Sequence, residues 1–201
     1  MSAILSTVKL IDKTIKTLNY SFSERDDVFF TTSFGYQSAL LFALLSEAGI
    51  TMNCLAIKSR LAYGGIDEHS EMLNKNYNFN LTVVDRDDWL TNSLGDSHFL
   101  DLDQTTRRTI CRELKRGPVT EFINRNDYGI WITGIRRQQT EKRRETRFMD
   151  TTDMGVVKIA PMASWGDEDV RRALAAFDLP ANDKYVDICK LNDAKECGLH
   201  Y

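Results

Sequence analysis

The sequence predicts an α/β protein in which a parallel, twisted sheet of about five strands is covered by helices on both faces. Short runs rich in β-branched and aromatic residues alternate with longer apolar or amphipathic stretches. The short runs are apolar almost throughout, which is typical of strands buried on both faces of a parallel sheet. Because 201 residues with 42% hydrophobic content can bury one sizeable core, we expect one domain over residues 1–180 and a tail over 181–201.

The first half of the chain contains three of the expected strands, and helices flank each of them. An N-terminal amphipathic helix is predicted because Ile4, Val8 and Ile11 recur at helical spacing. A second helix is apolar nearly all round, as expected for one buried against a sheet, and Gly49 ends it. We predict helices over residues 3–19, 39–48 and 66–77, and strands over 28–32, 52–57 and 79–84.

The second half is less regular. We predict a helix over residues 106–115 and a separate helix that begins at Pro118, because proline suits a first helical turn. Further strands are predicted over 129–133 and 156–159, and a final helix over 168–177 behind a capping segment at 164–167. From Leu179 onward no periodicity is visible, so we expect an irregular, mobile tail.

Composition limits the classes of function. The net charge of −3 argues against a nucleic-acid partner. The chain contains no apolar run near the roughly 20 residues that span a bilayer and no signal-peptide pattern, so we expect a cytoplasmic protein without a membrane partner. In that compartment the four cysteines are expected to stay reduced.

Two segments that follow predicted strands are candidate anion sites. The turn Ser33–Ser38 enters a helix, and backbone N–H groups at such a point can bind phosphate or sulfate. A tight turn without a ligand is an equal alternative. The second segment is Gly134–Arg144, directly after a predicted buried strand, and the overlapping stretch Arg136–Arg147 holds six basic residues against two acidic ones. Guanidinium groups bind such anions bidentately, although a solvated loop is the alternative.

The cysteines differ in their expected roles. Cys197 lies near the end of the tail, and nearby cations would activate its thiolate as a nucleophile. His200 either assists it or is simply solvated. Cys54 lies in an apolar strand and is expected to pack there. Cys111 and Cys189 are far apart in sequence, and neither has a Cys-x-x-Cys partner, so a complete metal site from this chain is not expected.

Four motifs in order resemble those of the sulfonucleotide reductases, the phosphoadenylyl-sulfate and adenylyl-sulfate reductases of sulfate assimilation. They are Ser33-Phe34-Gly35-Tyr36-Gln37, Gly134-Ile135-Arg136-Arg137-Gln138-Gln139-Thr140 with Arg143, Pro161 with Trp165, and Glu196-Cys197-Gly198-Leu199-His200. The resemblance extends from the first helix to the last residue. It implies an adenine nucleotide α-hydrolase-like fold.

The resemblance also implies a two-step reaction. Cys197 would attack the sulfur of the activated sulfate, form an S-sulfocysteine and release the adenosine phosphate, and a thioredoxin or glutaredoxin thiol would then free sulfite. Cys197 and His200 are therefore the expected catalytic residues. The expected substrate-binding residues are Ser33, Phe34, Gly35, Gln37, Ser38, Lys115, Arg136, Arg137, Gln139 and Arg143.

Some members of the family carry a [4Fe–4S] cluster on an adjacent cysteine pair and a later Cys-x-x-Cys. Here Ile110-Cys111 stands at the place of the cysteine pair, and only Cys189 stands at the place of the Cys-x-x-Cys. Because two of the four cluster ligands remain, we expect neither a cluster nor another tightly bound cofactor. The two cysteines could still bind a metal or bridge subunits. Cluster-free members use the 3′-phosphorylated substrate, so we expect a phosphoadenylyl-sulfate reductase, and a homodimer.

Three alternatives stay open at this point. The protein could be an adenylyl-sulfate reductase, an ATP pyrophosphatase-type enzyme of the same loop class, or a nucleotide-binding relative without catalysis. The pyrophosphatase class typically presents Ser-Gly-Gly-x-Asp-Ser. Here Phe34 and Gln37 stand in place of the second glycine and the aspartate, so this alternative ranks below the reductases.

Overall fold

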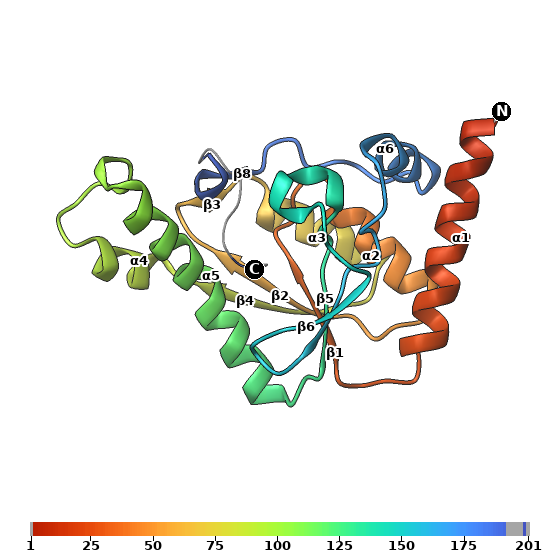
Figure 1. Ribbon diagram of the computed structural model, residues 1–201, viewed down its shortest axis with the longest axis horizontal. Helices are drawn as coiled ribbons and strands as arrows, with labels where there is room; N and C mark the ends of the chain where they lie inside the picture. The colour runs from red at the N-terminus through yellow and green to blue at the C-terminus, as the bar shows by residue number, and fades with distance from the viewer. Residues whose placement is uncertain (1, 192–198, 200–201) are drawn as a thin grey trace.

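The computed structural model describes residues 2–191 and Leu199, and it is built around a six-stranded sheet (Figure 1). The strand order is β4-β2-β1-β5-β7-β6, and all neighbours are parallel except the edge strand β6, which runs antiparallel to β7. A second, two-stranded sheet pairs β3 with β8. The predicted fold class is therefore confirmed, with six strands in the main sheet in place of about five.

The helices and strands have the following bounds. The strands are β1 Val28–Thr32, β2 Asn53–Lys58, β3 Ala62–Tyr63, β4 Asn80–Asp85, β5 Ile130–Ile132, β6 Met149–Thr151, β7 Val157–Ile159 and β8 Val186–Asp187. The α-helices are α1 Ser2–Phe22, α2 Ser38–Glu47, α3 Ile66–Asn76, α4 Asp87–Leu94, α5 Gln104–Asn126 and α6 Asp167–Ala176. Short 3₁₀ helices are η1 Phe99–Asp101, η2 Arg137–Gln139, η3 Glu141–Arg143 and η4 Ile188–Lys190.

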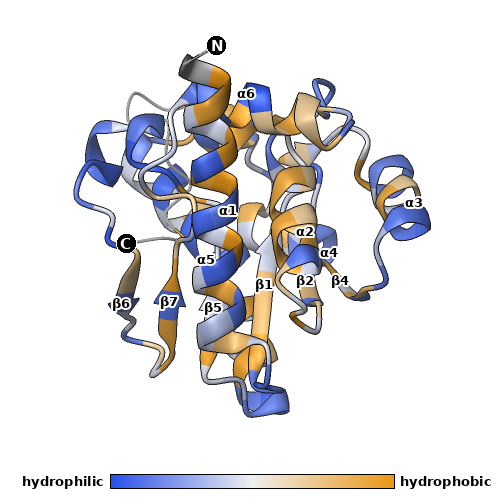
Figure 2. Ribbon diagram, turned by 90° about the vertical axis from the view of Figure 1, so that its right-hand side faces the viewer, coloured by the Kyte–Doolittle hydropathy of each residue, from blue (hydrophilic) through white to orange (hydrophobic). Residues whose placement is uncertain are grey.

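Alternating side chains of the central strands supply two separate cores. On β1, Phe30 packs in a cluster with residues of α1, α2, α3 and α6, whereas Phe29 packs on the opposite face with Val119 and Ile123 of α5. Trp131 of β5 joins the α5 side, and its ring is stacked on Phe29 with centroids 6.2 Å apart. Figure 2 shows α1 and α2 in front of the sheet, with α2 and β1 mostly hydrophobic. Burial on both faces explains why these strands read as continuous apolar runs.

Helix α5 differs from its prediction. We expected one helix to end before Pro118 and another to start there, but one helix runs through Pro118 from Gln104 to Asn126. Proline in a helix interior removes one backbone hydrogen bond. The helix persists because buried residues lie on both sides of Pro118, with Leu114 before it and Val119 after it, so packing overrides the local preference.

The chain after Leu179 also differs from its prediction. Residues 186–190 form β8 and η4 instead of an irregular segment, and Asn182 and Asp187 are buried. Strand β8 pairs antiparallel with β3, and the Ile188 N–H donates to the Leu61 carbonyl at 2.7 Å. The predicted irregular structure is therefore wrong for residues 186–190, and residues 192–198, 200 and 201 of the expected tail lie outside the described residues.

Two cysteines expected to be reduced are paired. Cys111 of α5 and Cys189 of η4 form a disulfide across a sequence separation of 78 residues. Cys54 is a free thiol buried in β2, and burial raises its pKa to about 12, which fits its expected packing role. No helix in the described part of the chain is long and apolar enough to span a membrane.

Gly64 is required where the β3 segment meets the chain before β8. Its φ is +99°, and an added Cβ would lie 2.0 Å from the Lys184 carbonyl oxygen. Gly95 also has a positive φ, +56°, but nothing lies within 4 Å of the position that a Cβ would take there. The two glycines therefore share an unusual backbone conformation, and only Gly64 also lies against another part of the chain.

We expect Gly64→Ala to lower the free energy of unfolding by about 1–3 kcal/mol more than Gly95→Ala, because only the first adds a backbone collision to the shared dihedral strain. Urea unfolding of both variants measures the difference. Equal losses would contradict the close approach of Gly64 to Lys184.

Candidate active site

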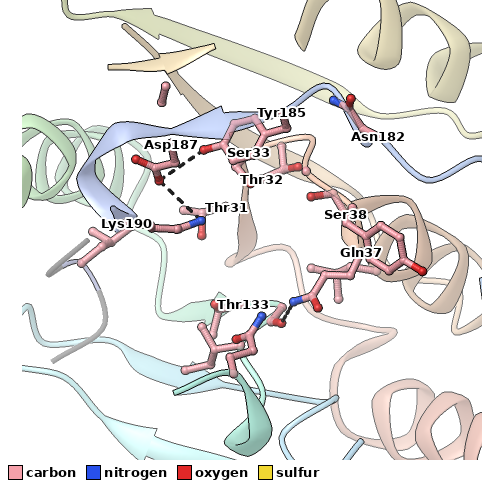
Figure 3. Close-up of a pocket in the computed structure, with 18 of the residues that line it drawn as sticks. Thr31, Thr32, Ser33, Gln37, Ser38, Thr133, Asn182, Tyr185, Asp187 and Lys190 are labelled. Atoms are coloured by element: carbon pink, nitrogen blue, oxygen red, sulfur yellow. Dashed lines mark hydrogen bonds and ion pairs between the residues drawn. The ribbon is translucent and has the colours of Figure 1, made fainter. Parts of the chain in front are cut away.

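A pocket of about 500 Å³ opens at the carboxyl ends of the central parallel strands. Thr31 and Thr32 at the end of β1, Ile57 of β2, and Thr133 after β5 lie at its base. Figure 3 shows Tyr185, Asp187 and Lys190 on one side of the pocket and Gln37 and Ser38 on another. The carboxyl edge of an open α/β sheet is where such folds bind ligands, and the volume suits a small molecule of nucleotide size.

The loop between β1 and α2 supplies the first wall. Phe34 adopts a φ of +50°, and its side chain is fully buried against Phe42 with ring centroids 5.7 Å apart. A left-handed conformation is uncommon for an aromatic residue and is tolerated where the surroundings enforce it. Here the Phe34 N–H donates to Thr32 Oγ1 at 3.0 Å, and the Asn182 amide donates to the Phe34 carbonyl at 2.7 Å. The buried ring therefore anchors the loop while Ser33 and Gly35 face the pocket.

A polar network joins this loop to the segment after β5. The Gln37 amide donates to the Gly134 carbonyl at 2.6 Å, and Arg136 Nε donates to Gln37 Oε1 at 2.9 Å. Gln139 Oε1 accepts from the Arg136 N–H at 3.0 Å and from Arg143 Nη1 at 2.5 Å. These bonds fix the Arg143 guanidinium at the pocket, where it lies nearly buried.

The third wall is a charged cluster between α5 and β8. The Asp187 carboxylate, whose side chain is 2% exposed, lies 2.7 Å from Lys115 Nζ and 3.4 Å from Lys190 Nζ. Tyr185 Oη donates to the same carboxylate at 3.4 Å. Burial alone would raise the pKa of Asp187, but the two lysines outweigh it and hold the pKa below its ordinary value of 3.8. The cluster therefore carries two cations and one anion at neutral pH.

The structure brings most of the predicted binding residues to this one pocket. Its lining includes Ser33, Gly35, Gln37, Ser38, Lys115, Gln139 and Arg143. The predicted catalytic residues Cys197 and His200 lie outside the described residues. Leu199, which stands between them in the terminal motif, lies in the pocket wall.

Three predicted residues do not present side chains to the pocket. The Phe34 ring is core, as described above. Arg136 is buried and turns away, with Nη2 2.7 Å from Asp167 and Nη1 donating to the Trp165 carbonyl. Arg137 Nε donates to the Thr146 carbonyl at 2.7 Å, and its side chain lines a separate surface hollow. In this structure the Phe34 and Arg136 side chains therefore support the pocket from behind, and their predicted part in substrate binding stays a prediction.

Several lining residues were not predicted from the sequence. They are Tyr36, Thr133, Asn182, Asp183, Tyr185, Asp187 and Lys190. Most lie in the stretch predicted to be an irregular tail. The alternation of Tyr185, Asp187 and Cys189 with apolar residues was the available signal, but β8 has only two residues, too few for a strand pattern.

Cys111 and Cys189, which stand where some family members carry cluster ligands, do not fit an iron–sulfur cluster. Cys111 and Cys189 bond to each other, and four cysteine ligands are needed for a cubane. Within residues 2–191 and at Leu199, no group of three or more His, Cys, Asp or Glu side chains is placed to hold a metal ion.

Fold and pocket together define an α/β protein with a candidate anion-binding pocket at the carboxyl edge of a parallel sheet, as in adenine nucleotide α-hydrolase-like folds. The family model for the phosphoadenosine phosphosulfate reductase domain matches residues 27–189. The chain therefore belongs to the phosphoadenosine phosphosulfate reductase family, which confirms the resemblance seen in its motifs.

Curated relatives carry two different names. A phosphoadenosine 5′-phosphosulfate reductase of Xanthomonas axonopodis pv. citri is 30% identical over 157 residues, which cover 75% of this chain and 62% of that protein. An adenosine 5′-phosphosulfate reductase of Bacillus cereus is 21% identical over 213 residues, covering 93% of this chain and 90% of that protein. The chain thus spans less than two thirds of the Xanthomonas relative.

Solved structures agree on the fold. A phosphoadenylyl-sulfate reductase from Candida auris, solved as a phosphate complex, superposes with a TM-score of 0.68 at 15% identity, covering 85% of this chain and 82% of that one. An NMN synthetase from Francisella tularensis superposes with a TM-score of 0.58 at 14% identity, covering 87% and 71%. At these identities the likeness shows the fold alone.

We expect Asp187→Asn to lower the free energy of unfolding at neutral pH by about 3 kcal/mol, because it leaves the buried Lys115 charge without its carboxylate. The folded-state pKa of Asp187 is depressed, so this contribution is present above pH 3.8 and is lost as the pH falls through the native pKa. The deficit of the variant should therefore shrink below pH 3.8.

Chemical denaturation at several pH values measures this deficit. Asp153→Asn is the matched control, because Asp153 pairs with Arg116 on the surface at 64% exposure and should change stability little. A deficit for Asp187→Asn that is no larger than that of the control would contradict the buried ion pair.

Proposed function

We propose that this protein is a thiol-dependent reductase that converts 3′-phosphoadenylyl sulfate to sulfite and adenosine 3′,5′-bisphosphate. The Cys197 thiolate attacks the sulfonate sulfur, so that an Sγ–S bond forms while the bond from sulfur to the phosphate oxygen breaks. The adenosine bisphosphate leaves with that bonding pair. A thioredoxin or glutaredoxin thiol supplies the electrons that free sulfite from the S-sulfocysteine.

The observation that carries the proposal is the meeting of the terminal motif with the cationic pocket. Leu199, two positions after Cys197, lies in the wall of the pocket that Lys115, Arg143 and Lys190 also line. The three cations would bind the phosphate and sulfonate oxygens and stabilise the charge that develops on the leaving phosphate. The amino-terminal end of α2, with Ser38 in the pocket, adds N–H donors for the same groups.

The preference for the 3′-phosphorylated substrate rests on the lack of cluster ligands, because cluster-free members of the family use that substrate. Adenylyl sulfate is the second candidate, since curated relatives of this chain are named as reductases of adenosine 5′-phosphosulfate. We further propose that the protein acts in the cytoplasm as a homodimer and that His200 assists Cys197.

Protein purified without added thiol and with the Cys111–Cys189 disulfide intact should accumulate a sulfonate adduct on Cys197 when it is given sulfur-labelled phosphoadenylyl sulfate. Intact-mass and peptide mass spectrometry locate the adduct. Cys197→Ser should bind the nucleotide and form none, and adenylyl sulfate should react more slowly. Nucleotide binding without any adduct would refute the reductase and favour a non-catalytic relative.

Arg143→Gln should lower kcat/KM for the sulfonucleotide by roughly 10²-fold, because it removes a fixed cation from the site of developing charge. Arg144→Gln is the matched control. Arg144 pairs with Glu141 at 2.8 Å on the surface and is 71% exposed, so its loss should leave kcat/KM nearly unchanged. Equal effects of the two changes would exclude Arg143 from the site.

A further inference from the structure

The Asn182 side chain joins three separate parts of the pocket wall (Figure 3). Its Nδ2 donates to the Phe34 carbonyl at 2.7 Å and to the Gly64 carbonyl at 3.1 Å, and its Oδ1 accepts from the Lys184 N–H at 3.1 Å. Phe34 lies in the loop after β1, Gly64 in the turn after β3, and Lys184 in the chain that leads to β8. One amide therefore holds together segments that lie up to 148 residues apart in the sequence.

The hydrogen-bonding capacity of Asn182 shows what the side chain does in the wall. A primary amide has two N–H hydrogens, and the Phe34 and Gly64 carbonyls use both. Only one orientation of the amide satisfies its neighbours, because two of them are acceptors and the third is a donor. The residue is 7% exposed. Asn182 therefore spends its donors on the backbone of the wall, so any effect on a ligand passes through that backbone.

The bond to Phe34 fixes one peptide plane of the loop after β1. A trans peptide is planar, so its C=O and the N–H of the following residue point in opposite directions. By holding the Phe34 carbonyl, Asn182 sets the direction of the Gly35 N–H. Phe34 needs such support, because a φ of +50° is uncommon for a residue with a bulky side chain.

The chain around Asn182 also contacts the loop and the turn directly. A Cβ at Gly35 would lie 3.1 Å from Tyr185 Cδ1 and 3.2 Å from Ser33 Oγ, so a larger residue there would have to displace the Tyr185 ring. At Gly65, where φ is +72°, a Cβ would lie 3.2 Å from both polar atoms of the Asn182 amide. Residues 182–185 therefore close one side of the loop after β1.

We propose that Asn182 is a positioning residue for anion binding, and that it acts through the peptide that joins Phe34 to Gly35. This inference rests on the proposed function, in which the loop after β1 contacts the phosphate and sulfonate oxygens of the sulfonucleotide. With Asn182 in place, the Gly35 N–H is oriented before the anion binds, which lowers the cost of ordering the loop. Without this amide, the peptide plane can rotate, and the anion has to order it.

Asn182→Asp tests the assignment, because the carboxylate has nearly the same shape but places an acceptor against two carbonyl oxygens. We expect the Kd for adenosine 3′,5′-bisphosphate, measured by titration calorimetry, to rise about tenfold. The KM for phosphoadenylyl sulfate should rise with it while kcat changes less than about twofold, because Asn182 acts on binding and not on the reacting atoms. Asn182→Ala removes the donors without adding a charge and should act in the same direction.

Asn126→Asp is the matched control. The Asn126 Nδ2 also donates to a backbone carbonyl, that of Phe122 at 2.8 Å, but it does so at the exposed end of α5 and outside the pocket lining. The nucleotide Kd and the KM should therefore stay at their wild-type values in this variant.

A backbone measurement separates positioning from a general loss of structure. In protein labelled with isotopic nitrogen at glycine, the Gly35 N–H resonance should shift when the wild type binds adenosine 3′,5′-bisphosphate, and it should shift less in both Asn182 variants. The Gly95 and Gly155 resonances should be the same in all proteins, because nothing lies within 4 Å of a Cβ position at either glycine.

The outcomes separate this inference from the proposed function. A wild-type Kd and KM in both Asn182 variants would overturn the positioning role alone, as would a full Gly35 shift in variants that bind weakly. Displaced Gly95 and Gly155 resonances in both variants would show a general structural role and would also overturn it. A wild type that neither binds the nucleotide nor forms the sulfonate adduct would overturn the proposed function and this inference with it.

Discussion

The parallel pairing of β2, β1 and β5 is the constraint on which the rest of this structure depends. Parallel strands place their carboxyl ends at the same edge, so three separate segments of the chain converge there: the Ser33 loop after β1, the segment after β2 and the arginine-rich segment after β5. The connections between them are covering helices, which bury both sheet faces and keep the strands apolar. The polar side chains of the site can therefore gather only at this edge.

The pocket is organised by buried hydrogen bonds more than by the number of its cations. The Gln37 amide donates to the Gly134 carbonyl and accepts from the Arg136 guanidinium. The Gln139 side-chain oxygen accepts from both the Arg136 N–H and Arg143. The Asp187 carboxylate pairs with two lysines. Each of these polar groups would be costly to bury alone. The disulfide closes the charged wall from behind, because it joins α5 to η4. Since the cations are already positioned in this structure, the anionic nucleotide of the proposed function would need little reorganisation of the pocket to bind.

Much of the fold could be read from local patterns. The apolar runs, the helical spacing in α1 and the glycine after α2 predicted the central strands and helices, because burial on both faces and helix amphipathicity leave direct marks on a sequence. The family motifs likewise predicted Ser33, Gln37, Lys115 and Arg143 as neighbours. Strand β6 left no such mark, since all three of its residues are exposed.

Tertiary structure alone decided the remaining features. Helix α5 runs through Pro118 because packing on both sides outweighs the lost hydrogen bond. Strand β8 exists because β3 and the Asn182 bonds hold it, and Asp187 becomes a buried anion only because Lys115 approaches from 72 residues away. Sequence by itself determined which segments could be buried and which motifs were present. Contacts between distant segments determined which polar groups are paired, and therefore the charge and shape of the pocket.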